Sequence, residues 1–327
     1  MRFDPAVRHK ACYGRRRQFR MMPSTRRQFL ASSLGVAAAL ATAGCIDDTP
    51  GTDDDTPTDF GTEPKGSPSE TEVPPPASAE RTVGGDAVAV FDIVAEKAVT
   101  YESIMGSGGV VAPEGWQFVV ASVRSDAELE LDAFSLRVGG ETLAAVDPGD
   151  AGAQNDAVAG HEGGIVGSPE LTGGDAARYV AFELDSPIQV DDPQIVLERG
   201  GESATWSLPD EAAETLAGSA PSFELDSLSA PDSVTQGEAM TVELSVTNTS
   251  DTDGRFVAAA YWPTELIADD DESHLIEQSV DAGASTTATL TIDTGYTTDE
   301  DGPITLRIEG HVSAEQEITV EDASTPT

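Results

Sequence analysis

Few residues of this sequence combine the types and the spacing that catalysis or metal binding requires. A zinc or copper site needs His and Cys ligands at short, regular spacing. A hydrolytic nucleophile needs a Ser or Cys beside a base, typically on a recognisable turn. The histidines lie far apart and have no ligand-spaced neighbours; they are His9, His161, His274 and His311. The sequence therefore predicts a protein that is not an enzyme and holds no cofactor.

Carboxylates are the remaining candidates for chemistry. Hard oxygen ligands for Ca²⁺ could come from expected loops, at Asp251, Asp253, Asp269 and Asp271. Their spacing matches no EF-hand loop, and acidic runs are usually solvated surface. Structural calcium is thus an alternative to the absence of any metal. A close pair of carboxylates would make the protein a hydrolase, but nothing in the sequence selects such a pair.

One thiol has a defined sequence context. Cys45 ends an apolar segment of small residues, Leu30 to Gly44, and the only other cysteine is Cys12. Fifteen residues are fewer than the roughly 20 that a membrane-spanning helix needs. The segment is therefore expected to be a cleaved export signal rather than a permanent anchor.

The residues around this segment resemble two export motifs. The first resembles a twin-arginine (Tat) signal and is carried by Arg26, Arg27, Phe29 and Leu30. The second resembles a lipobox and is carried by Ala43, Gly44 and Cys45. Residues 22–44 would then be a signal peptide, and residues 1–21 a mis-called start or an extended charged region. The resemblance implies attachment to membrane lipid through Cys45, at the extracellular face of the cytoplasmic membrane.

The charge of the chain limits the classes of partner that it can bind. The formal net charge is −41, and from Cys45 onward 58 acidic residues face only 9 basic ones. Such a surface repels phosphate backbones, so nucleic acid is excluded as a partner. Dispersed carboxylates with few lysines resemble the proteins of haloarchaea, in which strong salt screens the repulsion between like charges.

Amino-acid composition divides the chain after residue 44 into a polar segment and two folded domains. Residues 45–82 are rich in Asp, Thr and Pro and contain almost no large apolar side chain. Such a segment buries too little surface to offset chain entropy, so a disordered stalk is expected. Two folded domains follow, at 83–209 and 222–322, joined by a linker at 210–221 and followed by a tail at 323–327.

Short alternating segments separated by Gly, Asp and Pro predict an all-β fold of two tandem immunoglobulin-like β-sandwiches. The expected strands are 88–94, 116–123, 134–138, 179–184, 195–199, 204–208, 240–248, 256–262, 275–280, 286–292, 304–308 and 317–320. No strand is expected between Asp147 and Ala177, where His161 would lie in an insertion or a binding loop. Core positions are expected for the strand aromatics, which are Trp116, Trp206, Tyr261 and Trp262.

The second domain resembles the CARDB-like family of immunoglobulin-like domains, through the phrase that ends in Val246-Thr247-Asn248-Thr249-Ser250 and the strand 304–308. The first domain weakly resembles immunoglobulin-like domains of prokaryotic lipoproteins. These resemblances imply a non-catalytic binding, adhesion or spacer module with an envelope protein or glycan partner. An accessory subunit of a membrane transporter or other envelope complex is the alternative. Asn248-Thr249-Ser250 is also a glycosylation sequon, which predicts a glycan on Asn248 at an exposed turn.

Overall fold

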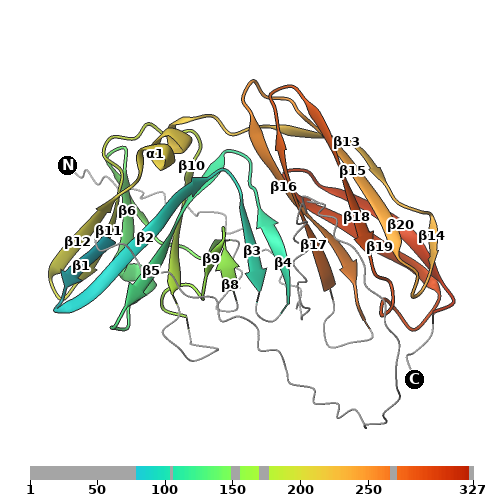
Figure 1. Cartoon of the computed structure of the whole chain (residues 1–327), viewed down its shortest axis with the longest axis horizontal. Coiled ribbons are helices and arrows are strands. Elements are labelled where there is room, and N and C mark those ends of the chain that lie inside the picture. Colours follow the sequence, from blue (N-terminus) through green and yellow to red (C-terminus); the bar gives the residue numbers. More distant parts are fainter. Residues whose placement is uncertain (1–78, 104–105, 149–154, 169–176, 266–270, 324–327) are drawn as a thin grey trace, which may run out of the picture.

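The computed structural model describes residues 79–103, 106–148, 155–168, 177–265 and 271–323. The all-β prediction is confirmed, since strands form most of this part of the chain (Figure 1). The expected signal, the lipidation residue Cys45 and the stalk up to residue 78 lie outside the described residues, as does Asp269.

In its described residues, the first domain contains twelve strands, a 3-10 turn and one α-helix. In chain order these are β1 (Glu80–Val83), β2 (Asp86–Glu96), β3 (Val99–Ser103), β4 (Gly106–Val111), β5 (Trp116–Ser125), η2 (Leu131–Ala133), β6 (Phe134–Val138), β7 (Glu141–Ala144), β8 (Asn155–Val158), β9 (His161–Glu162), β10 (Arg178–Asp185), β11 (Gln194–Arg199), β12 (Glu202–Ser207) and α1 (Asp210–Ala217).

This domain has three β-sheets rather than the two of the expected sandwich. A central sheet, β1-β2-β5-β10, lies between the sheet β12-β11-β6-β7 and the sheet β4-β3-β8-β9. Alternate residues of the central strands serve two cores. In β5, Val119 belongs to the core shared with β6, β11 and β12, whereas Phe118 and Val120 belong to the core shared with β3 and β8. Both faces of the central sheet are therefore buried.

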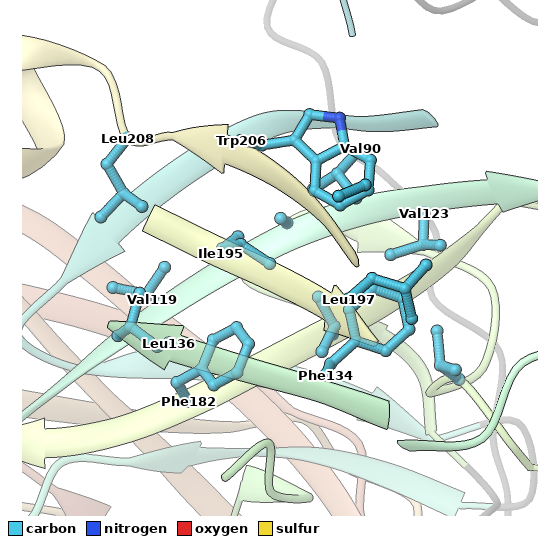
Figure 2. Packing of buried hydrophobic residues seen from close by; sticks show 14 of the residues in the cluster. Val90, Val119, Val123, Phe134, Leu136, Phe182, Ile195, Leu197, Trp206 and Leu208 are labelled. Carbon is cyan, nitrogen blue, oxygen red and sulfur yellow. The ribbon is translucent and has the colours of Figure 1, made fainter. Parts of the chain in front are cut away.

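The larger of these cores is built from branched and aromatic side chains (Figure 2). Phe134 and Leu136 of β6 and Ile195 of β11 are buried, and they pack with Val119 and Phe182 of the central sheet. Trp206 is 3% exposed, and its indole N–H donates to the carbonyl of Ala79 at 2.6 Å. Ala79 and β1 thus pack with the first domain, although they precede the boundary expected at residue 83.

The second domain is a two-sheet sandwich. Its strands are β13 (Phe223–Ser229), β14 (Ser233–Thr235), β15 (Met240–Asn248), β16 (Gly254–Pro263), β17 (Asp271–Val280), β18 (Ser285–Ile292), β19 (Gly302–Gly310) and β20 (Ala314–Glu321). The sheet β13-β15-β18 packs on the sheet β14-β20-β19-β16-β17 around one core that includes Trp262 and Met240. All pairs are antiparallel except β14 with β20.

The two domains meet through sheet faces. Strand β4 of the first domain contacts β16, β17 and β19 of the second. The sheets therefore follow one another across the molecule, as Figure 1 shows from β12 at the left to β20 and β14 at the right. Val257 and Ala259 of β16 point away from the core of their own domain and are fully buried. Their burial marks the face that the first domain covers.

Candidate binding site between the two domains

The second domain places its basic residues toward the first domain. Arg255 and Arg307 are the only Lys or Arg residues after Arg199. Nη1 of Arg255 lies 2.7 Å from Oε2 of Glu96 in β2, and its Nε lies 3.0 Å from Oε1 of Glu277. Burial raises the pKa of Glu96, and the charge of Arg255 opposes that shift. The ion pair therefore joins the domains at the end of β2.

A tyrosine pair forms a second contact between the domains. Tyr101 of β3 and Tyr261 of β16 interact through a side-chain hydrogen bond, and burial raises the pKa of both hydroxyls. The guanidinium carbon of Arg307 lies 5.3 Å from the centre of the Tyr261 ring, a cation–π contact. A side chain at Gly109 in β4 would collide with Tyr101. Glycine in β4 thus allows this close approach.

A groove of about 550 Å³ lies beside these contacts. One part of its lining is the end of β2 and the two residues after it, Ile93 to Ala98. Residues of α1 and the following linker form a second part, and Thr252 to Arg255 of the second domain form the third. A volume of this size lies within the range of sites that hold small molecules or peptide side chains.

Lys97 ties the linker to the first domain beside this groove. Its ammonium donates to Oε1 of Gln117, to Oγ of Ser186 at 3.0 Å and to the carbonyl of Gly218 at 2.7 Å. Burial lowers the pKa of Lys97 to about 8. Gln117 is fully buried and donates from Nε2 to the carbonyls of Asp185 and Leu216. These bonds fix α1 and the linker, and so the position of this wall of the groove.

A β-bulge bends β2 where the groove begins. The register of β2 against β5 shifts between Phe91 and Val94, and Asp92 has a φ of 50°. Nε2 of His161 lies 2.6 Å from the carbonyl oxygen of Asp92, and the imidazole is 5% exposed. His161 begins β9, a strand that follows β8 in the segment where no strand was expected. The histidine therefore supports the bulge and does not lie in an open loop.

The calcium candidates do not assemble a ligand set among the described residues. No group of three or more His, Cys, Asp or Glu able to hold a metal occurs there. Oδ1 of Asp253 accepts the backbone N–H of Ala282 at 2.9 Å, which is the role of a turn residue. Asp251 is exposed in the same turn. Asp271 begins β17, and Asp269 lies outside the described residues.

Asn248 has a structural role that conflicts with its expected exposure. Its side chain is fully buried, and Nδ2 donates to the carbonyls of Thr252 at 2.9 Å and Val280 at 3.1 Å. Its Oδ1 accepts from the backbone and the hydroxyl of Ser250. The expectation that the sequon presents Asn248 on an exposed turn is therefore wrong, because the acceptor nitrogen is engaged inside the fold.

The strand aromatics divide between core and surface. Trp206 and Trp262 are buried as expected, and the indole N–H of Trp262 donates to Oγ1 of Thr297 at 2.7 Å. Trp116 is 42% exposed, so the expectation of a core position is wrong for this residue. It is the first residue of β5, next to the exposed turn at Gly115, where a strand end no longer lies between two sheets.

Comparisons with known proteins add little to this geometry. No family model matches the chain, and no curated protein matches it. A β-glucosidase from Listeria innocua is similar in structure, with 22% identity and a TM-score of 0.29, over 33% of this chain and 17% of that chain. A DUF4785 family protein from Legionella pneumophila has 12% identity and a TM-score of 0.20, over 72% of this chain and 57% of that one. At such values these similarities carry no argument about function.

Sequence reasoning missed the groove and its lysine. Lys97 is one of only two lysines after Cys45. Its rarity in so acidic a chain is the sequence feature that could have marked it as a candidate site residue. Its three acceptors lie 20, 89 and 121 residues away in sequence, so no local pattern predicts them. The structure also contains, in its described part, no helix long and apolar enough to cross a bilayer.

Proposed function

We propose that this protein is a non-catalytic binding, adhesion or spacer module on the surface of a haloarchaeal cell. It is exported by a twin-arginine signal and held through a lipid on Cys45, with residues 45–82 as a stalk below the folded domains. The second domain is CARDB-like in this proposal. An envelope protein is the partner that the proposal favours.

The observation that supports this proposal is the interface between the two domains, which contains an ion pair and a tyrosine pair. Arg255 contributes to it through the ion pair with Glu96, and Arg307 packs on Tyr261, which forms a side-chain hydrogen bond with Tyr101 of the first domain. Arg255 and Arg307 are the only cations of the second domain, in a chain of charge −41, and both lie on the side that faces the first domain. This arrangement is expected if the two domains are held in a fixed geometry. Such a body can present a surface at a set height above a membrane. The groove beside the interface gives that body a concave surface for a partner.

Cross-linking in intact cells at native salt tests the proposal. The protein is purified after cross-linking and the captured proteins are identified, with Cys45→Ser as the matched unanchored form. A reproducible envelope partner that is lost with Cys45→Ser is the expected result, and a stoichiometric one would make the protein an accessory subunit. Recovery of the protein alone would favour a spacer. Turnover of a substrate by the purified chain would contradict the non-catalytic assignment.

A further inference from the structure

The two folded domains carry nearly equal negative charges. Residues 79–221 contain 26 acidic and 6 basic side chains, a net charge of −20. Residues 222–323 contain 23 acidic and 2 basic side chains, a net charge of −21. Two bodies of like charge repel each other, so the contacts between the domains must offset this repulsion.

The contacts between the domains are short in range. Each sheet of the described residues belongs to one domain, so no ladder of main-chain hydrogen bonds crosses the interface. Contact is made by the Arg255–Glu96 ion pair, by the hydrogen bond between Tyr101 and Tyr261, and by packing of β4 on the face that carries Val257. Separation of the domains would break these contacts without breaking a sheet.

A short segment connects the parts of the chain that are fixed to each domain. The carbonyl of Gly218 accepts from Nζ of Lys97 at 2.7 Å, so the chain is held to the first domain up to this residue. The carbonyl of Ser222 accepts the backbone N–H of Thr249 at 2.8 Å, so the chain is held to the second domain from there. Residues 219–221 lie between these fixed points, outside any helix or strand. A few loop residues between two rigid bodies are the usual structure of a hinge.

Salt changes the repulsion between the domains more than it changes their contacts. The distance over which charges act is about 30 Å at 0.01 M ionic strength and about 3 Å at 1 M. In low salt the carboxylates throughout one domain therefore repel those of the other, whereas in molar salt only near neighbours interact. The side chains of Arg255 and Glu96 are 29% and 33% exposed, so salt screens this pair less than the surface carboxylates. Lowering the salt therefore adds more repulsion than attraction across the interface.

We propose that ionic strength operates this hinge: molar salt lets the two domains close on each other, and low salt opens them about residues 219–221 while each domain stays folded. Each domain keeps its own hydrophobic core in the open form, because no cluster of buried residues combines side chains of both domains. The inference goes beyond the proposed binding function and does not depend on it.

The hinge also controls the groove between the domains. Its lining combines Ile93 to Ala98 and part of α1 from the first domain with Thr252 to Arg255 from the second. Opening separates these walls, so the concave surface is complete only in the closed form. Salt concentration thereby determines whether this surface is available to a partner.

Distances between spin labels test the proposal. The full chain carries Cys12→Ser and Cys45→Ser, and labels are attached at Glu211→Cys on α1 and Asp251→Cys in the second domain, both exposed positions. The distance distribution is measured by double electron–electron resonance in about 3 M and about 0.05 M KCl. We expect one narrow distribution in high salt. In low salt we expect a broad distribution whose mean is longer by about 10 Å or more.

Label pairs within each domain separate opening from unfolding. Glu141→Cys with Ser203→Cys reports on the first domain, and Ser229→Cys with Ser313→Cys reports on the second; all four positions are exposed. Both distances should be the same in high and low salt. An unchanged distance between the domains would overturn the proposal. A change that occurs only together with a change inside a domain would also overturn it, because it would indicate unfolding.

Charge variants show whether repulsion drives the opening. Glu315, Glu317 and Glu321 are exposed on β20, in the sheet that β4 covers. Changing all three to Gln should lower the KCl concentration at the midpoint of closure about twofold, whereas changing all three to Asp, which keeps the charge, should leave it unchanged. Arg255→Gln removes a cation from the interface and should raise the midpoint about twofold. A midpoint that does not move with charge would overturn the proposal, and the single substitution keeps it testable if the triple variant misfolds.

Discussion

His311 makes the stability of the second domain depend on pH. Its ring packs against the rings of Phe223 and Phe256, whose centres lie 4.9 and 6.0 Å away. The backbone N–H of Val257 donates to Nδ1 at 3.0 Å, so this nitrogen carries a lone pair in the folded state. Burial lowers the pKa of His311 to about 4, and the nearby charge of Arg255 acts in the same direction.

The sign and the size of the effect follow from linkage. A histidine whose pKa is about 4 when folded and 6.5 when unfolded binds more protons in the unfolded chain between these values. Stability is therefore complete above pH 6.5 and is lost as the pH falls toward 4. Relative to pH 7.5, the expected loss is about 2 kcal/mol at pH 5 and about 3 kcal/mol at pH 4.

The assay compares urea unfolding of wild type and His311→Gln at pH 7.5 and pH 5, in constant high salt. Glutamine can accept the Val257 N–H and does not titrate between these pH values. Carboxylates titrate in both proteins, so the difference between them isolates His311. We expect the wild type to lose about 2 kcal/mol more than the variant on going to pH 5. Equal losses in the two proteins would refute the reasoning.

Three further substitutions test the interface and the turn. Arg255→Gln leaves Glu96 half-buried without its cation, so the free energy of unfolding should fall by about 1–2 kcal/mol at pH 7.5. Because burial raises the pKa of Glu96, this loss of stability should become smaller toward pH 5. A loss that becomes larger toward pH 5 would contradict this argument. Gly109→Ala should displace Tyr101 and cost about 1–3 kcal/mol by thermal unfolding, whereas Gly302→Ala, with open space around it, should change stability by less than about 0.5 kcal/mol. Asn248→Ala should cost about 2–3 kcal/mol because it removes the partners of buried polar groups. Mass spectrometry should find Asn248 unmodified, and a glycan there would refute the burial argument.

The sequence by itself determined the all-β class and most strand positions. Strict alternation placed β6 at 134–138 and β15 at 240–248 with the bounds that the structure has. Alternation is a local property of a strand with one buried face, so it can be read without knowing the partner strand. The segment expected as a linker at 210–221 contains the helix α1.

Only the tertiary structure decided the third sheet and the contact between the domains. The run Phe118 to Val123 in β5 shows no alternation because both faces of that strand are buried. Strand β4 is short and glycine-rich, so its residues carry no hydrophobic period to recognise.

The candidate site was beyond the sequence for a related reason. The Arg255–Glu96 pair joins residues 159 positions apart, and the acceptors of Lys97 come from three separate segments. Local sequence sets how a strand alternates, whereas pairing, covering and the grooves left between domains depend on where distant segments meet.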